Sequence, residues 1–341
     1  MYFLTRATHS YIKEKLIQDN LFRISYNKIM STSLLTSSSA VMPPREIKSG
    51  KKEKLAKNKL NLIHEKDCLV FMDELPEKVL DVIVTSPPYN LHKKYSKYKD
   101  NKENSVYVEW MGLVAEKSKR VLKDDGSFFL NIVGSPSEPW VPFDVAKEFA
   151  KYFKLQNTIH WVKAIALPKE STETKHNSNG LNGDISLGHF KPINTPKYLN
   201  QCHEYIFHFT KEGTVELDKL AIGVPYQHES NQTRWKTKSN KRDRGNTWFV
   251  RYENKQGAFT PIVHPAIFPE KIPYLCIKLH GVEPETLVYD PFMGIGTTAL
   301  ACLRLGVSFL GTEIDARYVK EAEKQILKRK EDLLTLKSNG H

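Results

Sequence analysis

Residues 288–298 read VYDPFMGIGTT, and this stretch decides how the rest of the chain is interpreted. An apolar strand ends at Asp290, and a helix begins a few residues later. The glycines between them, Gly294 and Gly296, let the backbone come close to a ligand that side chains would block. The stretch therefore predicts a strand, a ligand-binding turn and a helix; the simpler alternative is a tight turn without a ligand.

The residues that follow the turn narrow the choice of ligand. Thr297 and Thr298 open the helix, whose N-terminus offers unpaired N–H groups to an anionic group or a carboxylate. The next strand ends at Glu313, and an acid in that place is suited to bind the hydroxyls of a ribose. Neither GxGxxG nor GxxxxGK(S/T) occurs, which argues against a dinucleotide or a nucleoside triphosphate. A nucleoside-type ligand without phosphates is a good candidate.

A second motif, TSPPYN at residues 85–90, starts at the last residue of another predicted strand. Its consecutive prolines fix the backbone and remove two N–H donors, so the carbonyl of Pro87 remains as an aimed acceptor. Ser86 adds a hydroxyl and Tyr89 an aromatic face, which together suit a planar ring that carries an NH2 group. For this motif alone, a proline-rich turn that ends a strand is the better interpretation.

Strands alternate with helices along most of the chain from residue 60. The apolar patterns predict strands at 60–66, 80–85, 127–133, 157–163, 204–209, 286–290 and 307–313, and helices at 69–78, 105–122, 143–154, 270–280, 297–305 and 315–336. This alternation predicts an α/β fold with a parallel, doubly wound sheet, in which ligands bind at the carboxyl ends of the strands. Regular periodicity fades over most of 165–260, which predicts an irregular insert.

The composition favours a protein with a polyanionic partner. The 341 residues include 51 Lys and Arg against 39 Asp and Glu, a net charge of +12, and such a surplus favours nucleic acid. No run of about 18 apolar residues occurs, so we expect no membrane span. The 4 cysteines show no CxxC spacing, and neither HExxH nor a paired-carboxylate set is present, so we expect no metal site.

Together, the two motifs resemble those of the amino-group DNA methyltransferases, which methylate N4 of cytosine or N6 of adenine with S-adenosyl-L-methionine. SPPY at 86–89 matches the family's catalytic motif (D/N/S)PP(Y/F), and residues 290–296 match its cofactor loop DxFxGxG. The catalytic motif precedes the cofactor loop, which resembles the permuted β-class order. HPAIFPE at 264–270 resembles a further segment of the family, and the likeness covers residues 60–330.

The resemblance implies a Rossmann-like methyltransferase sheet with an inserted, irregular DNA-recognition region. Its expected parts are a catalytic half at 60–164, the insert with the target-recognition region at 165–260, and a cofactor-binding half at 261–336; a core strand near 203–210 is expected to interrupt the insert. The basic, Ser- and Lys-rich extension at 1–59 is not covered by the likeness, and we expect it to be flexible.

The resemblance also implies the residues of the site. Catalysis is expected at Ser86, Pro87, Pro88 and Tyr89. Cofactor binding is expected at Asp67, Asp290, Phe292, Gly294, Gly296, Thr297, Thr298, Glu313, His264 and Pro265. In this set, Asp67 is the acid expected near the adenine and Glu313 the acid expected on the ribose.

The implied activity is transfer of a methyl group to the exocyclic amine of a base that is flipped out of duplex DNA. Serine at the first position of the catalytic motif usually accompanies N4-cytosine in this family. Ser86 therefore favours N4-cytosine methylation, as in restriction-modification methylases. The alternatives are N6-adenine methylation on the same scaffold, an RNA or protein-glutamine methyltransferase, and a DNA-binding module without catalysis.

Basic residues follow the catalytic motif and recur in the insert. We expect phosphate contacts from Lys93, Lys94, Arg234, Lys236, Lys241, Arg242 and Arg244. The expected partner is double-stranded DNA, and the expected location is the cytoplasm of a prokaryote-like cell, at the nucleoid. The sequence leaves open the recognition site, the oligomeric state and the existence of a cognate restriction endonuclease.

Overall fold

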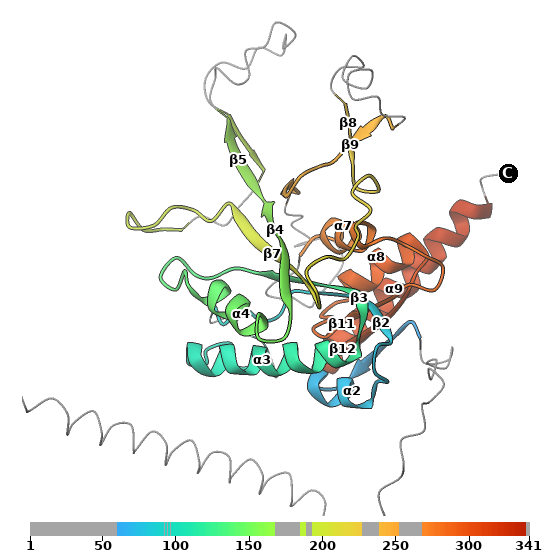
Figure 1. The fold of residues 1–341 in the computed structure, drawn as a ribbon, viewed down its shortest axis with the longest axis horizontal. Helices are drawn as coiled ribbons and strands as arrows, with labels where there is room; N and C mark the ends of the chain where they lie inside the picture. Colours follow the sequence, from blue (N-terminus) through green and yellow to red (C-terminus); the bar gives the residue numbers. More distant parts are fainter. Residues whose placement is uncertain are drawn as a thin grey trace, which may run out of the picture. The chain divides into compact units, whose positions relative to one another are not determined.

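The computed structural model describes residues 60–91, 93, 95, 97–167, 185–188, 193–226, 239–251 and 268–338. These residues build an eight-stranded sheet in the order β1-β12-β11-β2-β3-β7-β4-β10 (Figure 1). In that order the strands are Leu62–Glu65, Ser308–Glu313, Leu287–Asp290, Leu80–Thr85, Leu122–Ile132, His203–Thr210, Lys154–Val162 and Thr247–Phe249. The extension at 1–59 lies outside the described residues.

Helices cover both faces of the sheet, as a doubly wound fold requires (Figure 1). One face carries α2 (Cys68–Glu74), α3 (Asn104–Val121) and α4 (Val141–Phe149), and the other carries α7 (Lys271–His280), α8 (Thr297–Leu305) and α9 (Ala316–Ser338). In β2, Ile83 packs into the first core, whereas Val82 and Val84 pack into the second. Burial on both faces explains why residues 82–84 of β2 are a continuous apolar run instead of an alternating pattern.

The doubly wound α/β class is confirmed, and the sheet is mostly parallel as expected, with one strand as the exception. β7 runs antiparallel to both of its neighbours, β3 and β4, while the other pairs in this sheet are parallel. The alternation of apolar residues does not encode strand direction, because a strand buries the same side chains in either orientation.

The predicted helices and strands are present, and most of their ends differ by a few residues. α2 ends at Glu74 and not at 78, since Pro76 has no N–H with which to continue the helix. β3 begins at Leu122 and not at 127, because Leu122 pairs with Leu80 across an irregularity in the register. A strand missing from the prediction is β10, which pairs in parallel with β4 and has only a short apolar segment.

The insert also forms short ladders outside the main sheet. β5 (Ala164–Leu167) pairs with β6 (Ile185–Gly188), and β8 (Val224–Pro225) pairs with β9 (Lys241–Arg242), both antiparallel. Figure 1 shows β5 and the β8–β9 ladder beyond the end to which β4 points. The carboxyl ends of the parallel strands lie at this edge, so the ladders project from the edge where a ligand is expected.

The strand order brings the two motifs of the sequence together. β2 precedes the SPPY motif and β11 precedes the glycine turn, and these strands are parallel neighbours with Ile83 opposite Tyr289. Both segments therefore leave the sheet at the same edge and in adjacent positions, although Thr85 and Asp290 are far apart in the sequence.

Candidate active site

A buried carboxylate joins the ends of β2 and β11. Asp290 has no exposed surface, and its Oδ1 accepts hydrogen bonds from the Thr85 hydroxyl at 2.6 Å and the Phe292 N–H at 2.9 Å. Its Oδ2 accepts a hydrogen bond from the Thr298 hydroxyl at 2.5 Å. One side chain thus fixes the last residue of β2, the glycine turn and the first turn of α8 relative to one another.

Both glycines of the turn have positive φ angles, 54° at Gly294 and 91° at Gly296. Gly296 is the N-cap of α8, and a Cβ added there would lie 3.0 Å from the Cβ of Ala322. The Gly294 N–H donates a hydrogen bond of 3.0 Å to Oε2 of Glu313. The backbone geometry therefore requires glycine at 296, and the turn is tied directly to the end of β12.

Glu313 stands at the predicted acid position, and its carboxylate is held by the backbone. Its Oε1 accepts the Asp315 N–H at 2.9 Å, while Oε2 accepts the Gly294 N–H. Burial raises the pKa of Glu313 above its usual value, and these N–H groups oppose the shift. A carboxylate oxygen can accept more than one hydrogen bond, so Glu313 keeps acceptor capacity for ligand hydroxyls.

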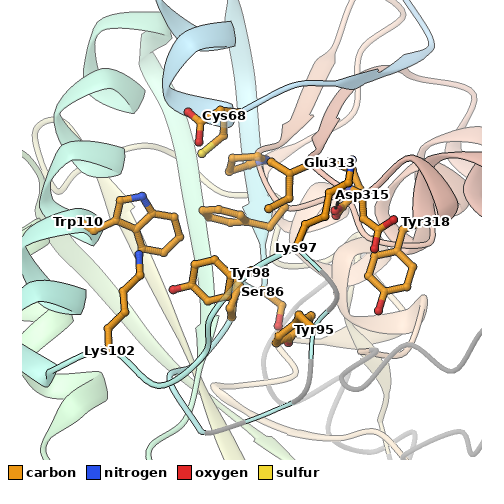
Figure 2. A pocket seen from close by; sticks show the side chains of 15 residues that line it. Cys68, Ser86, Tyr95, Lys97, Tyr98, Lys102, Trp110, Glu313, Asp315 and Tyr318 are labelled. Carbon is orange, nitrogen blue, oxygen red and sulfur yellow. Dashed lines mark hydrogen bonds between the residues drawn. The ribbon is translucent and has the colours of Figure 1, made fainter. Parts of the chain in front are cut away.

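A pocket opens at this edge of the sheet, between α3, the loop after β2 and the start of α9 (Figure 2). It is lined by Asp67, Cys68, Ser86, Pro88, Tyr95, Lys97, Tyr98, Lys102, Trp110, Pro291, Phe292, Glu313, Ile314, Asp315 and Tyr318. Figure 2 shows Trp110 and Lys102 on one side, Glu313, Asp315 and Tyr318 on the other, and Ser86 between them. Ser86 of the first motif and the acid that ends β12 therefore line one common pocket.

Five of the predicted site residues line this pocket: Asp67, Ser86, Pro88, Phe292 and Glu313. Asp67 has a structural role that explains its position. Its Oδ1 accepts the N–H groups of Leu69 at 2.8 Å and Val70 at 3.2 Å, and it is thus the N-cap of α2. Helix α2 consequently holds this acid at the rim of the pocket.

Other predicted residues lie behind the pocket wall. Pro87, Tyr89, Asp290, Thr297 and Thr298 are buried, and the pocket lining contains none of their side chains. Gly294 and Gly296 contribute through the backbone of the turn. His264 and Pro265 lie outside the described residues, so their predicted role stays a prediction.

Aromatic residues that the sequence did not identify as ligand contacts form much of the pocket. Trp110 lies 5.4 Å from Phe292 between ring centroids, and Lys102 Nζ lies 4.8 Å from the ring centroids of both Tyr98 and Trp110. Burial lowers the pKa of Lys102. Trp110 belongs to the apolar series of α3, and that periodicity does not distinguish a pocket wall from a core contact.

The loop after the catalytic motif carries the pocket residues Tyr95, Tyr98 and Lys102, and hydrogen bonds hold both of its ends in place. Asp100 is buried, and its carboxylate accepts the N–H groups of Asn90 at 2.8 Å, Leu91 at 3.1 Å and Lys93 at 2.9 Å. The Asn90 side chain pairs with both the N–H and the carbonyl of Lys102, each at 2.8 Å. These contacts hold the loop against the pocket. From the sequence, the lysines of this loop are expected to contact DNA phosphates, whereas Lys97 and Lys102 line the pocket.

The serine and tyrosine of the catalytic motif contact each other. Ser86 Oγ lies 2.6 Å from the Tyr89 hydroxyl, which donates a hydrogen bond of 3.0 Å to Oε2 of Glu204 on β7. Tyr89 is only 9% exposed, so its ring lies behind Ser86 and not on the pocket wall. The sequence did not connect Glu204 with the motif, because nothing local shows that β7 lies beside β3.

Three predicted DNA-contact residues lie near the β8–β9 ladder. Lys241 and Arg242 are exposed on β9, whereas Arg244 is half-buried and its Nε donates to the carbonyl of Ile222 at 2.8 Å. Lys93 is half-buried in the loop after the catalytic motif. The remaining predicted contacts, Lys94, Arg234 and Lys236, lie outside the described residues.

The pocket suits a nucleoside-type cofactor such as S-adenosyl-L-methionine. The buried hydroxyl of Tyr98 has no hydrogen-bond partner among the described residues, and Tyr98 lines the pocket. A bound molecule with polar groups would satisfy it. Glu313 offers a carboxylate for ribose hydroxyls, and the aromatic rings of Trp110 and Phe292 offer apolar surface for a base.

Comparison with known proteins identifies the family of this chain. A family model described as DNA methylase matches residues 80–324. The chain belongs to the DNA methylase family. Type II methyltransferase M.BglII from Bacillus subtilis is 27% identical over 279 residues, which cover 77% of this methylase and 68% of the relative. DNA adenine methyltransferase YhdJ from Escherichia coli (strain K12) is 24% identical over 274 residues, which cover 77% of this methylase and 81% of that relative.

Solved structures share the fold of this methylase. The PvuII DNA methyltransferase (cytosine-N4-specific) superposes with a TM-score of 0.55 at 20% sequence identity, covering 80% of this methylase and 92% of that chain. This likeness confirms the Rossmann-like methyltransferase sheet. An adenine enzyme and a cytosine enzyme both occur among the similar proteins, so the family is that of DNA amino-methyltransferases without a choice between the two amines.

Within the part of the methylase that the structure describes, no helix is long and apolar enough to cross a membrane. In the same residues, no group of three or more His, Cys, Asp or Glu side chains is arranged to hold a metal ion.

The buried carboxylate of Asp290 gives a pH-dependent prediction. Burial raises the pKa of Asp290 from 3.8 to about 6, against three hydrogen bonds that favour the ionised form. A carboxyl with a higher pKa in the folded than in the unfolded chain contributes stability at low pH, and this contribution is lost as the pH rises through 6. The unfolding free energy of the wild type minus that of Asp290→Asn should therefore grow by about 1.4 kcal/mol per pH unit from pH 6 towards 4.

Urea denaturation of both proteins between pH 4 and 8 measures this difference. Other titrating groups are common to the two chains and cancel in the subtraction. A difference that stays constant over the whole range would show that Asp290 has an ordinary pKa.

Proposed function

We propose that this methylase transfers a methyl group from S-adenosyl-L-methionine to the exocyclic N4 of a cytosine flipped out of duplex DNA, at a specific site. The observation that carries the proposal is the junction at Asp290, which holds the SPPY motif beside the glycine turn. Methyl transfer between two bound molecules depends mainly on their placement, which can lower the barrier by roughly 7–11 kcal/mol.

The cofactor pocket is the cavity lined by Asp67, Phe292 and Glu313. Glu313 would bind the ribose hydroxyls, the rings of Phe292 and Trp110 would pack against the adenine, and Asp67 would accept a hydrogen bond from its amine. When bound, S-adenosyl-L-methionine supplies an electrophilic methyl group on a sulfonium. The chain's own contribution is to hold this group beside Ser86, which lines the same pocket.

The catalytic motif would act on the amine of the base. The nitrogen lone pair of an aromatic amine is delocalised into the ring, so the amine is a poor nucleophile. Hydrogen bonds donated by the amine to the Ser86 hydroxyl and the Pro87 carbonyl would draw the nitrogen towards tetrahedral geometry and turn its lone pair to the methyl group. No covalent intermediate with the protein is required, and the buried cysteines Cys68, Cys276 and Cys302 have raised pKa values that keep them as thiols.

The choice of cytosine rests on Ser86, because serine at this position of the motif accompanies N4-cytosine. A target within a duplex must be extruded from the stack, at a cost of a few kcal/mol. Exposed basic residues on the β8–β9 ladder support duplex DNA as the partner. Such an enzyme would work at the nucleoid in the cytoplasm. Pairing with a restriction endonuclease that cuts the same site would fit the Type II names of its relatives.

The target base can be identified directly. Wild-type protein incubated with labelled S-adenosyl-L-methionine and long unmethylated duplex DNA should yield labelled N4-methylcytosine after digestion to nucleosides. Ser86→Ala should lower the transfer rate at least about 100-fold, since it removes an acceptor that acts in the transition state. Cofactor affinity should stay within a few-fold. Label found only in N6-methyladenine would overturn the cytosine assignment.

Ser105→Ala is the matched control, because Ser105 is exposed at the start of α3 and its hydroxyl donates a hydrogen bond of 2.7 Å to the exposed Glu103. This variant should retain wild-type transfer. Full activity in Ser86→Ala would remove Ser86 from the mechanism.

Glu313 should determine cofactor affinity. Glu313→Gln keeps the size of the side chain but loses its charge, so the dissociation constant for S-adenosyl-L-methionine should rise about 10- to 100-fold, as expected for a charged hydrogen bond. Isothermal titration calorimetry measures this change. Glu323→Gln, an exposed position on α9, is the control and should bind normally. Equal affinity in both variants would contradict the ribose assignment.

Lys241 and Arg242 should contact phosphates. Replacing both with alanine should weaken duplex binding and make the slope of log K against log salt shallower by about 1–2, which is the change expected for one or two lost phosphate contacts. Fluorescence anisotropy at several salt concentrations measures the slope. Lys119→Ala with Lys147→Ala removes the same charge near the C-terminal ends of α3 and α4, at the opposite edge of the sheet, and should leave the slope unchanged.

A further inference from the structure

A chain of hydrogen bonds runs from the pocket to an ion pair behind it. Ser86 Oγ lies 2.6 Å from Tyr89 Oη, and Tyr89 Oη lies 3.0 Å from Oε2 of Glu204. Asn131 Nδ2 donates to Tyr89 Oη and, at 2.6 Å, to the same Glu204 oxygen. Lys163 Nζ donates to the other oxygen, Oε1, at 2.9 Å. Only Ser86 among these residues lines the pocket.

The direction of each hydrogen bond in this chain is determined by its charged end. Glu204 forms an ion pair with Lys163 that is largely buried, and a carboxylate can only accept hydrogen bonds. Burial and the charge of Glu204 raise the pKa of Tyr89 well above its usual value, so the phenol keeps its proton. The phenol therefore donates its hydrogen bond to Glu204, and the phenol oxygen accepts a hydrogen bond from Asn131.

The direction of the last hydrogen bond follows from these contacts. Tyr89 has used its only proton, so the hydrogen bond between Ser86 and Tyr89 must be donated by Ser86. The hydrogen of the Ser86 hydroxyl therefore points away from the pocket, and its lone pairs remain available on the pocket side.

We propose that Glu204 is a positioning residue that acts through Tyr89 to fix the Ser86 hydroxyl as a hydrogen-bond acceptor for the target amine. The inference rests on the proposed function, because it concerns the group that would hold the amine. A carboxylate at the first position of the motif accepts in any orientation, whereas a serine hydroxyl can also rotate and donate. Serine at 86 thus requires a neighbouring group that decides its orientation.

Substitution of Glu204 by glutamine should reverse this arrangement. The introduced amide can present its NH2 group to Tyr89, which frees the phenol proton to point at Ser86. The Ser86 hydrogen would then turn into the pocket and oppose the N–H groups of the amine. Tyr89→Phe has a milder consequence, since Ser86 loses its partner and rotates freely. The family motif accepts phenylalanine at this position, so this variant should lose only a small part of its activity.

The test is a double-mutant cycle on the single-turnover rate of methyl transfer at saturating cofactor and unmethylated duplex DNA. Glu204→Gln should be at least about 10-fold slower than the wild type, and Tyr89→Phe about 2- to 5-fold slower. The double variant should match Tyr89→Phe and therefore be faster than Glu204→Gln alone, because without the hydroxyl Glu204 has no route to Ser86. Cofactor affinity serves as the control and should change little in each variant. The unfolding temperature of Glu204→Gln should fall, because Lys163 loses its ionic partner, so all rates are measured well below the lowest unfolding temperature of the series.

A merely structural role of Glu204 predicts a different pattern, in which the double variant is slower than either single variant. That pattern, or a Glu204→Gln rate within twofold of the wild type, would overturn the inference while leaving the proposed function intact. A wild-type protein that transfers no methyl group would overturn both. If Glu204→Gln prevents folding, Glu204→Asp and Glu204→Asn form a second isosteric pair. The carboxylate variant should then be the faster of the two, and the opposite order would refute the inference.

Discussion

The carboxylate of Asp290 is the interaction on which the arrangement of the site depends. Its oxygens accept hydrogen bonds from Thr85 at the end of β2, from Phe292 in the glycine turn and from Thr298 in the first turn of α8. A carboxylate without exposed surface is costly to bury, and the donors arranged around it offset this cost only when the three segments are in place. The requirement to satisfy one buried group therefore positions the backbone of two distant motifs.

Much of this fold and part of the site could be predicted from local sequence. The motifs at 86–89 and 290–296 have fixed positions at strand ends, and periodicity identified the strands and helices to within a few residues. The direction of β7 could not be predicted, because apolar alternation is the same in both orientations. The role of Trp110 as a pocket wall depends on Phe292 lying across the cavity, a contact between residues far apart in the chain.

The position of Tyr89 illustrates the same limit more sharply. As part of the SPPY motif it suggested an aromatic face for a base, but its hydroxyl lies in a polar cluster supplied by β3 and β7. Buried polar groups need partners, and the cluster with Glu204 and Asn131 provides them. A ring that is held by its hydroxyl in this way is less free to move than a ring packed only against apolar neighbours.

The pairing of β10 with β4 affects how the insert could be exchanged in protein engineering. The indole of Trp161 on β4 donates to the carbonyl of Val250, and both Trp161 and Trp248 are buried. The end of the insert is thus joined to the sheet by the pairing of β10 with β4 and by the hydrogen bond between Trp161 and Val250. A chimera that exchanges this region with that of a relative would have to keep Trp161, Trp248 and Val250 of the host. The exchangeable segments would then be the ladders β5–β6 and β8–β9, which lie between the two tryptophans in the chain.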